Sequence, residues 1–433
     1  MGFRSLVKKL IPKSLFAAVE PYGHLVEAVF FNVIYGFPTR NLKVIGVTGT
    51  NGKSTTCFMI HRMLQDAGYN TGLMSTISYG VGEDIKPQMH HMTTVSTPEL
   101  LSRIREMKKQ DMSWLILETT SHALAQHRVW GVPYSIAVLT NITHEHLGYH
   151  KTFKNYQRAK LKMFDLANKA KGLKVGVINA DDPSAELFAS HIKNPILYGI
   201  ESGEVKAKNV KLSTTEVSFV AEAQDESYQI KCHIPGSFNV SNALAAVCVG
   251  RVIGLSKKQI EQGIANLKGV EGRMTKIDVG QDFDVIVDYA HSPDSFEKLF
   301  KDLKPILKGR AIVVFGSLGG GDVGKRAEQG KLAGQFADIV IVTEEDDRKE
   351  DPDQIAKNIA DGVEAAGKKL GEDLLLIHDR PKAIQEAINM ARKNDMVLTL
   401  GKGHEKTIEH ADGEHPWDEA GEVRKALSKR LSK

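Results

Sequence analysis

The chain has 433 residues, of which 42% are hydrophobic and 25% charged, as in an ordinary globular protein of two or three domains. Its 57 basic and 53 acidic residues leave a net charge of +4, too small a surplus to indicate a nucleic-acid-binding protein. The three cysteines show no C-x-x-C spacing, so we expect neither a zinc site nor a disulfide framework. This pattern fits a cytoplasmic protein.

Residues 1–40 differ from the rest and are expected to form a basic, apolar helical arm. Four cations come first, namely Arg4, Lys8, Lys9 and Lys13. The charge-free apolar run over residues 28–39 is too short for a membrane span, which needs roughly 20 apolar residues. Two interpretations stay open: a helix packed on the first domain, and a basic amphipathic helix in weak contact with a membrane surface.

The stretch KVIGVTGTNGKSTT, residues 43–56, predicts a buried strand that turns into a glycine-rich loop and then a helix. Such a loop aims backbone N–H groups and a helix N-terminus at an anion, and the triphosphate of ATP is the anion we expect. Strict Walker spacing would need glycine at Val47, so the pattern that fits is the variant G-T-N-G-K-S. The predicted nucleotide-binding residues of the loop are Gly49, Thr50, Asn51, Gly52, Lys53, Ser54 and Thr55.

Strands and helices alternate from residue 43 to about 180, which predicts a parallel sheet covered by helices. Residues 205–234 alternate with a period of two and are expected to add antiparallel strands. Near Gly272 the alternation restarts with five strand-like runs, FDVIVDYA, AIVVFGS, DIVIVTE, DLLLIHD and DMVLTLG. The predicted fold class is therefore α/β, with a mostly parallel P-loop central domain over 41–270 and a C-terminal Rossmann-like domain over 271–433.

Polar residues follow several of these strands at their carboxyl ends, where ligands bind in open α/β sheets. Glu118 ends the run WLILE, and TNITHEHLGYH places His144, His146 and His150 after the next strand. These two strand ends and the P-loop could share one metal–phosphate site. In the C-terminal half, DYAHSPDS and GKGHE follow strands in the same way.

Taken together, these motifs resemble the Mur ligase family, and within it the MurE branch. The matching segments, in family order, are GTNGKSTT, STPEL, ETTSHALAQHRV, TNITHEHLGYH, AKLKMF, PGSFNVSNALAA, GRM, DYAHSPD, TEEDDRKEDP and GKGHE. The resemblance implies a cytoplasmic enzyme that uses ATP and Mg²⁺ to join a free amino acid to a muramyl-peptide-type acceptor in peptidoglycan precursor synthesis. It also implies an acyl-phosphate intermediate.

The resemblance further implies roles for the residues at matching positions. Lys53 would hold the outer phosphates, and Ser54 and Glu118 would hold one Mg²⁺. Glu118 and His146 would hold a second together with Lys160, which the family carries as N6-carboxylysine. The implied nucleotide contacts are Asn239, Arg273, Asp288 and His291; the acceptor contacts are Ser96, Thr97, Ser121, Gln126 and Arg128; the amino-acid contacts are Arg348, Gly401 and Glu405.

Some departures from the family pattern leave both substrates open. Family members begin with a separate domain that grips UDP; the P-loop begins near residue 46 here, so we expect that domain to be absent and leave the acceptor's carrier undecided. Diaminopimelate-adding members carry D-N-P-R where this chain has E-D-D-R, residues 345–348. Val323 stands where the family has an arginine that helps recognise the added amino acid, and Glu145 replaces the usual aspartate.

Two other functions stay open. The first is a folylpolyglutamate-synthetase-like or other γ-glutamyl ligase, which would use the same chemistry and whose sequence would also start directly at the P-loop. The segments TTSHALAQHRV and GKGHE favour the peptidoglycan branch instead. A non-catalytic nucleotide-binding scaffold subunit is of a different class. Such a subunit would have little need for the complete set of Lys53, Glu118, His146 and Lys160.

Overall fold

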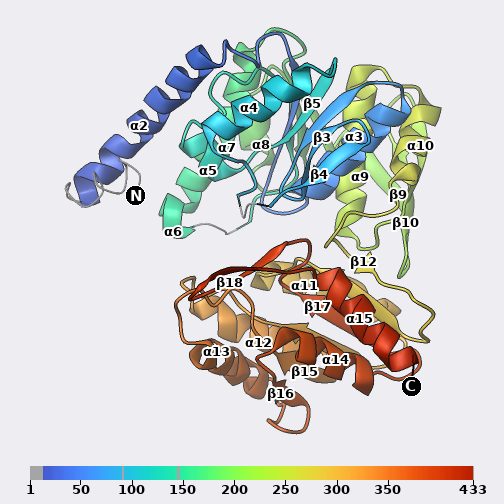
Figure 1. Ribbon diagram of the computed structural model, residues 1–433. Coiled ribbons are helices and arrows are strands. Elements are labelled where there is room, and N and C mark those ends of the chain that lie inside the picture. The colour runs from blue at the N-terminus through green and yellow to red at the C-terminus, as the bar shows by residue number, and fades with distance from the viewer. Residues whose placement is uncertain (1–12, 90–91, 144–146, 433) are drawn as a thin grey trace. The chain divides into compact units, whose positions relative to one another are not determined.

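The computed structural model describes residues 13–89, 92–143 and 147–432, which form two compact units (Figure 1). The first unit contains the described residues of Met1–Asn209 together with Phe219–Ile230 and Val240–Asn266. The second contains Val210–Ser218, Lys231–Asn239 and the described residues from Leu267 onward. No helix in the described ranges is long and apolar enough to cross a membrane. The domain bounds 1–40, 41–270 and 271–433 stay a prediction.

An 11-stranded sheet runs through the first unit. Its strands are β1 (Lys43–Thr48), β2 (Thr71–Met74), β3 (Ser78–Val81), β4 (Asp84–Pro87), β5 (Trp114–Glu118), β6 (Tyr134–Leu139), β7 (Val175–Asn179), β8 (Asn194–Gly199), β9 (Val205–Leu212), β10 (Val217–Glu222) and β11 (Ser227–Cys232). Their order is β11-β10-β9-β8-β7-β6-β1-β5-β2-β3-β4, with parallel pairing from β9 to β2 and antiparallel pairing at β3 and β4. The predicted mostly parallel sheet is confirmed, and residues 205–234 extend its edge.

Helices accompany this sheet in the alternation that the sequence predicts (Figure 1). They are α2 (Lys13–Ile34), α3 (Lys53–Asp66), α4 (Thr97–Lys108), α5 (Ser121–Ala125), α6 (Leu147–His150), α7 (Phe153–Lys169), α8 (Ala185–Ala189), α9 (Phe238–Ile253) and α10 (Lys257–Asn266). Helix α2 packs against α4, so the described part of the arm lies on the first unit.

The core of the first unit fixes β1 at the centre of the parallel strands. Val44, Ile45 and Val47 are fully buried, as expected for a strand covered on both faces. Gly46 has no side chain because Tyr134 and Met163 occupy that space; a Cβ at Gly46 would lie 2.5 Å from the tyrosine ring. Since β5 and β6 flank β1 in parallel, all three strands end at the same edge, where ligands bind.

The second unit is built on a six-stranded sheet with the order β12-β13-β17-β14-β15-β16. Its strands are β12 (Thr275–Lys276), β13 (Asp284–Asp288), β14 (Ala311–Phe315), β15 (Ile339–Val342), β16 (Leu374–Leu376) and β17 (Met396–Leu400), followed by the hairpin of β18 (Thr407–His410) and β19 (Gly413–Pro416). The helices are α11 (Pro293–Leu303), α12 (Gly324–Phe336), α13 (Pro352–Ala365), α14 (Arg380–Met390) and α15 (Glu419–Leu431), with the short helix η1 (Lys304–Ile306). The five predicted strands are all present and pair in parallel.

Candidate active site

The loop between β1 and α3 has a backbone that only glycine can supply at two positions. Gly49 has φ 154° and Gly52 has φ 82°. A Cβ at Gly49 would collide with Thr140 Oγ1, and one at Gly52 would collide with Asn242 Oδ1. Gly52 is the N-cap residue of α3, so the loop leads directly into the positive end of a helix dipole. This is the geometry that the sequence predicts for a phosphate-binding loop.

The end of β6 holds the loop in place. Asn141 accepts a hydrogen bond from Asn51 N at 2.9 Å through Oδ1 and donates from Nδ2 to Asn51 O at 3.0 Å. Thr140 Oγ1 donates to the same carbonyl at 2.6 Å. Lys53 curls back on the loop, where its Nζ donates to Thr50 O at 2.7 Å. The lysine ammonium therefore lies at the loop that the sequence assigns to phosphate.

Glu118 lies at the end of β5 and is fixed from two sides. Its Oε2 accepts hydrogen bonds from Ser54 Oγ and from Thr76 N, both at 2.9 Å, and its Oε1 accepts one from Thr76 Oγ1 at 2.8 Å. Only 1% of Glu118 is exposed. The nearby carboxylate also acts on Cys57 in α3: burial, and secondarily the negative charge of Glu118, raises the pKa of the Cys57 thiol.

A carboxylate and a hydroxyl oxygen side by side fit Mg²⁺, which prefers hard oxygen ligands. The donors Glu118 and Ser54 are thus suited to the predicted ion. Among the described residues, no group of three or more histidine, cysteine, aspartate or glutamate side chains is arranged to hold a metal ion by itself. The predicted ligand His146, with His144 and Glu145, lies outside the described residues.

Lys160 projects from α7 to the P-loop. Its Nζ donates to Gly49 O at 2.7 Å and lies 4.7 Å from the centre of the Tyr156 ring, and only 2% of the residue is exposed. Tyr156 OH in turn hydrogen-bonds Thr50 Oγ1 at 3.0 Å. One face of α7 therefore contacts the loop twice, through an amine and a phenol. The structure brings Lys53, Ser54, Glu118 and Lys160 together around one strand edge of the first unit.

The five residues implied for the acceptor also belong to the first unit. Thr97 Oγ1 donates to Arg128 O at 3.4 Å, and Arg128 Nε donates to Gln126 Oε1 at 3.0 Å. Ser96 precedes Thr97 as the N-cap residue of α4. Ser121, at the start of α5, is joined to a different neighbour, His150, whose Nε2 lies 3.0 Å from the serine Oγ. Thr97, Gln126 and Arg128 are therefore joined by hydrogen bonds, Ser96 is the chain neighbour of Thr97, and Ser121 has a separate contact.

Three of the implied nucleotide contacts meet at the carboxyl end of β13 in the second unit. Asp288 accepts hydrogen bonds from Met274 N and Ala290 N, both at 2.7 Å. Burial raises the pKa of Asp288, while the Arg273 guanidinium opposes that shift. The Arg273 guanidinium carbon lies 4.6 Å from the centre of the Tyr289 ring, and the His291 ring packs on the same tyrosine at 4.6 Å.

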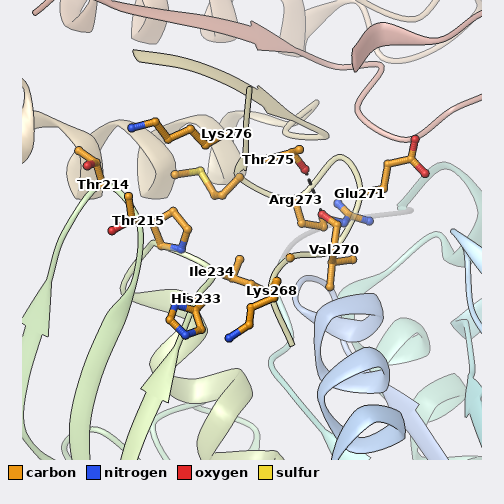
Figure 2. Close-up of a pocket in the computed structure, with 13 residues that line it drawn as sticks. Thr214, Thr215, His233, Ile234, Lys268, Val270, Glu271, Arg273, Thr275 and Lys276 are labelled. Carbon is orange, nitrogen blue, oxygen red and sulfur yellow. Dashed lines mark hydrogen bonds between the residues drawn. The ribbon is translucent and has the colours of Figure 1, made fainter. Parts of the chain in front are cut away.

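Asn239, the fourth implied nucleotide contact, is fully buried, and its Nδ2 donates to Pro235 O at 2.7 Å. A pocket of about 350 Å³ lies beside these residues within the second unit (Figure 2). Figure 2 shows Arg273, His233, Lys268 and Lys276 among the side chains around it. Of the predicted residues that the structure describes, only Arg273 lines this pocket.

The residues implied for the incoming amino acid occupy the ends of β15 and β17. Gly401, with φ 101°, lies so close to Glu345 that a Cβ would come within 2.5 Å of its carboxylate. Glu405 pairs with the buried Lys402 at 2.5 Å. Arg348 instead pairs with Glu409, Nε to Oε2, at 3.0 Å. Gly401 and Glu405 are therefore close neighbours in one charged cluster, while the Arg348 guanidinium is engaged by β18.

Several residues of these sites were missed from the sequence. Thr76 fixes both oxygens of Glu118, and no motif marks it because it lies in a short turn between β2 and β3. Asn141 could have been found, since it follows the strand run SIAVLT directly. The buried pair of Lys402 and Asp346, at 2.7 Å, joins two loops 56 residues apart and has no local signal.

Comparison with known proteins decides the family. The profile of the Mur ligase middle domain matches residues 47–250, and that of the Mur ligase glutamate ligase domain matches residues 272–403. The chain is 40% identical over 421 residues to the UDP-N-acetylmuramyl-tripeptide synthetase of Roseiflexus sp. (strain RS-1), covering 94% of this chain and 83% of the relative. This chain belongs to the Mur ligase family.

Solved structures of Mur ligases have the same fold. A UDP-N-acetylmuramoyl-L-alanyl-D-glutamate–2,6-diaminopimelate ligase superimposes with a TM-score of 0.63 at 31% identity, covering 90% of this chain and 79% of that one. The folylpolyglutamate synthase of Mycobacterium tuberculosis, solved with ADP and AMPPCP, superimposes with a TM-score of 0.72 at 15% identity, covering 93% and 95%. At that identity the likeness concerns the fold alone.

Mur ligases are ATP-dependent ligases of peptidoglycan precursor synthesis. This Mur ligase is a MurE-like enzyme, because the relatives that it matches over most of its length are UDP-N-acetylmuramyl-tripeptide synthetases and diaminopimelate ligases. The predicted family, enzyme class and α/β fold are therefore confirmed. The roles of the individual site residues and the modification of Lys160 stay predictions.

Proposed function

We propose that this Mur ligase joins a free amino acid to the carboxylate of a muramyl-peptide-type acceptor, at a site built around Lys53, Ser54, Glu118 and Lys160. The observation that carries the proposal is the position of Glu118, held by Ser54 and Thr76 at the strand edge beside the P-loop. A buried carboxylate would be costly there without a positively charged partner. A nucleotide-bound Mg²⁺ would supply that charge.

The reaction has two steps. A carboxylate oxygen of the acceptor attacks the γ-phosphorus of ATP, ADP leaves, and an acyl phosphate forms. The amine of the amino acid then adds to the acyl carbon, loses a proton, and expels phosphate with the original carboxylate oxygen. Phosphoryl transfer depends mostly on positioning and charge neutralisation. We assign positioning to the loop of residues 49–54 and neutralisation of phosphate charge to Lys53, whose Nζ lies at the same loop, 2.7 Å from Thr50 O.

Mg²⁺ would be held by Ser54 and Glu118 and would neutralise phosphate charge when bound. We propose that Lys160 carries a carbamate. Carbamylation adds carbon dioxide to the neutral amine with loss of one proton, which converts a cation into an anionic oxygen donor. The contacts of Lys160 with Gly49 O and the Tyr156 ring place its Nζ beside the loop, where such a donor could join the metal set with His146.

For the remaining residues, we propose nucleotide contacts at Asn239, Arg273, Asp288 and His291, and amino-acid contacts at Arg348, Gly401 and Glu405. The proposed acceptor contacts are Ser96, Thr97, Ser121, Gln126 and Arg128. The guanidinium of Arg128 suits a carboxylate or phosphate. The enzyme would act in the cytoplasm, where ATP is available. The other expected partner, a membrane surface, concerns residues 1–40 alone and is independent of the ligase chemistry.

A phosphate-release assay tests this function. It offers UDP-muramyl-dipeptide, the UDP-free analogue or a folate, each with a panel of amino acids. We expect turnover that needs both a muramyl acceptor and one amino acid, and that is lost in Lys53→Ala but kept in Lys382→Ala, a change in an exposed lysine of α14. Turnover with the folate alone would favour a γ-glutamyl ligase. No acceptor-dependent turnover would favour the scaffold subunit.

A further inference from the structure

Helix α2 exposes large apolar side chains and buries polar ones, the reverse of an ordinary surface helix. His24, Ala28 and Asn32, spaced by four residues and therefore on one face, are the buried ones. Asn32 Nδ2 donates to Ala28 O at 2.9 Å and to Trp130 O at 3.2 Å. The most buried of the described side chains of α2 are thus polar or small, and the apolar Leu25 and Phe31 are only half-buried.

The opposite face of α2 and the turn after it carry large apolar side chains in water. The exposed members are Tyr22 (71%), Val26 (68%), Val29 (36%), Phe30 (57%), Val33 (60%), Ile34 (57%) and Phe37 (38%). We call these seven residues the outer face. Their spacing of three and four places them in one stripe along the helix. Figure 1 shows α2 reaching beyond the helices that surround the sheet of its unit.

The sequence that leads into α2 is cationic. Arg4, Lys8, Lys9 and Lys13 occur before the first acidic residue, Glu20. The next acidic residue, Glu27, lies 3.7 Å from His24 on the side that faces the protein. A cation-rich sequence that continues into a helix with an apolar stripe is typical of segments that bind the interface of an anionic bilayer, because the headgroups attract the cations and the acyl chains accept the apolar side chains.

We propose that the outer face docks the enzyme on an anionic lipid bilayer, whose headgroup charge is complementary to the cation-rich sequence that leads into α2. Helix α2 would lie in the plane of the interface, with the outer face at the boundary of headgroups and acyl chains. A second copy of the chain is the poorer occupant, since residues 1–40 hold four leading cations and only two acidic residues, Glu20 and Glu27. Docking would bring the ligase to any acceptor that is held at the membrane.

Vesicle flotation of the full chain tests this proposal. The probes are phosphatidylcholine vesicles with and without phosphatidylglycerol. We expect binding to the anionic vesicles, weakened by about tenfold or more in the triple variant Val26→Ser, Phe30→Ser, Val33→Ser. A matched triple change of exposed leucines elsewhere, Leu187→Ser, Leu212→Ser, Leu370→Ser, should bind like the wild type. Lys8→Gln with Lys9→Gln should weaken binding to the anionic vesicles only.

Two further measurements separate the outcomes. Phosphate release with a water-soluble acceptor should be unchanged in the Val26, Phe30, Val33 variant, which shows that the variant is folded. Light scattering without vesicles should give the same mass for wild type and variant. Equal vesicle binding by both proteins, or no binding by either, would overturn the proposal, and a mass that falls in the variant would point to a second copy. A failed ligase assay with intact vesicle binding would refute only the proposed ligation.

Discussion

Ser54 Oγ donates a hydrogen bond of 2.9 Å to Glu118 Oε2, which joins the P-loop helix to the end of a neighbouring strand across 64 residues of sequence. Because the same carboxylate is also bound by Thr76, its direction is set before any ligand arrives. Preorganised ligands lower the cost of holding a metal–nucleotide complex. This contact is the structural basis of the proposed ligase site.

Thr76→Val should weaken the response to Mg²⁺. The change removes the bond from Oγ1 to Glu118 Oε1 and leaves the backbone N–H bond to Oε2. Partners of this kind typically change metal affinity by about 10- to 100-fold, and we expect a shift at the lower end. The measurement is phosphate release against Mg²⁺ concentration at saturating ATP. Thr76→Ser keeps the hydroxyl and should behave like the wild type; a Mg²⁺ response unchanged in Thr76→Val would contradict the positioning role.

Lys160→Ala should lose activity that bicarbonate cannot restore. Wild-type enzyme depleted of carbon dioxide should lose activity as well and regain part of it on addition of bicarbonate, because only the wild type has an amine to carbamylate. A carbon-13 carbamate signal from labelled bicarbonate would report the modification without any turnover. Equal activity of wild type and Lys160→Ala, or no carbamate signal in an active enzyme, would refute the proposed carbamylation of Lys160.

Acid should destabilise both units, since each buries a histidine. Burial lowers the pKa of His61 to about 4 and that of His404 to about 3. The unfolded chain then binds more protons below its histidine pKa of about 6.5, so the free energy of unfolding falls as the pH drops from there toward 4. His61 alone accounts for up to about 3 kcal/mol of this loss.

Denaturant unfolding at several pH values measures this effect. His61→Gln should show a shallower fall in stability with acid, because glutamine has no proton to gain. The exposed His378→Gln serves as the control and should keep the wild-type slope. Parallel curves for the wild type and His61→Gln would contradict the assignment.

Most of the fold and the centre of the candidate site could be predicted from the sequence. Apolar runs such as WLILE and AIVVF are confirmed as buried strands, since complete burial on both faces leaves a continuous apolar signature. The P-loop could also be predicted, because its glycines determine the backbone conformation of the loop in which they occur. Contacts such as that of Thr76 with Glu118 could not be predicted, since they depend on which loops the fold brings together. Arg348 shows the same limit, because its partner Glu409 lies 61 residues away.

The second unit should depend strongly on the ion pair between Arg380 and Glu419. Both side chains are fully buried, and their N–O distance is 2.7 Å. Glu419→Gln leaves the guanidinium without its counter-charge, which costs about 3 to 5 kcal/mol of unfolding free energy. Replacing both residues with methionine should recover part of the loss. Glu422→Gln, in the exposed pair with Lys425, should have little effect; equal losses from the two single changes would contradict the argument.

The transfer of an acceptor oxygen tests the central claim most directly. The acceptor carboxylate is labelled with oxygen-18 and supplied with ATP, Mg²⁺ and the amino acid that supports turnover. Ligation through an acyl phosphate predicts that the released phosphate carries one labelled oxygen for each amide bond formed. A second reaction uses unlabelled acceptor in oxygen-18 water. Unlabelled phosphate in the first reaction and labelled phosphate in the second would show plain ATP hydrolysis and contradict the account.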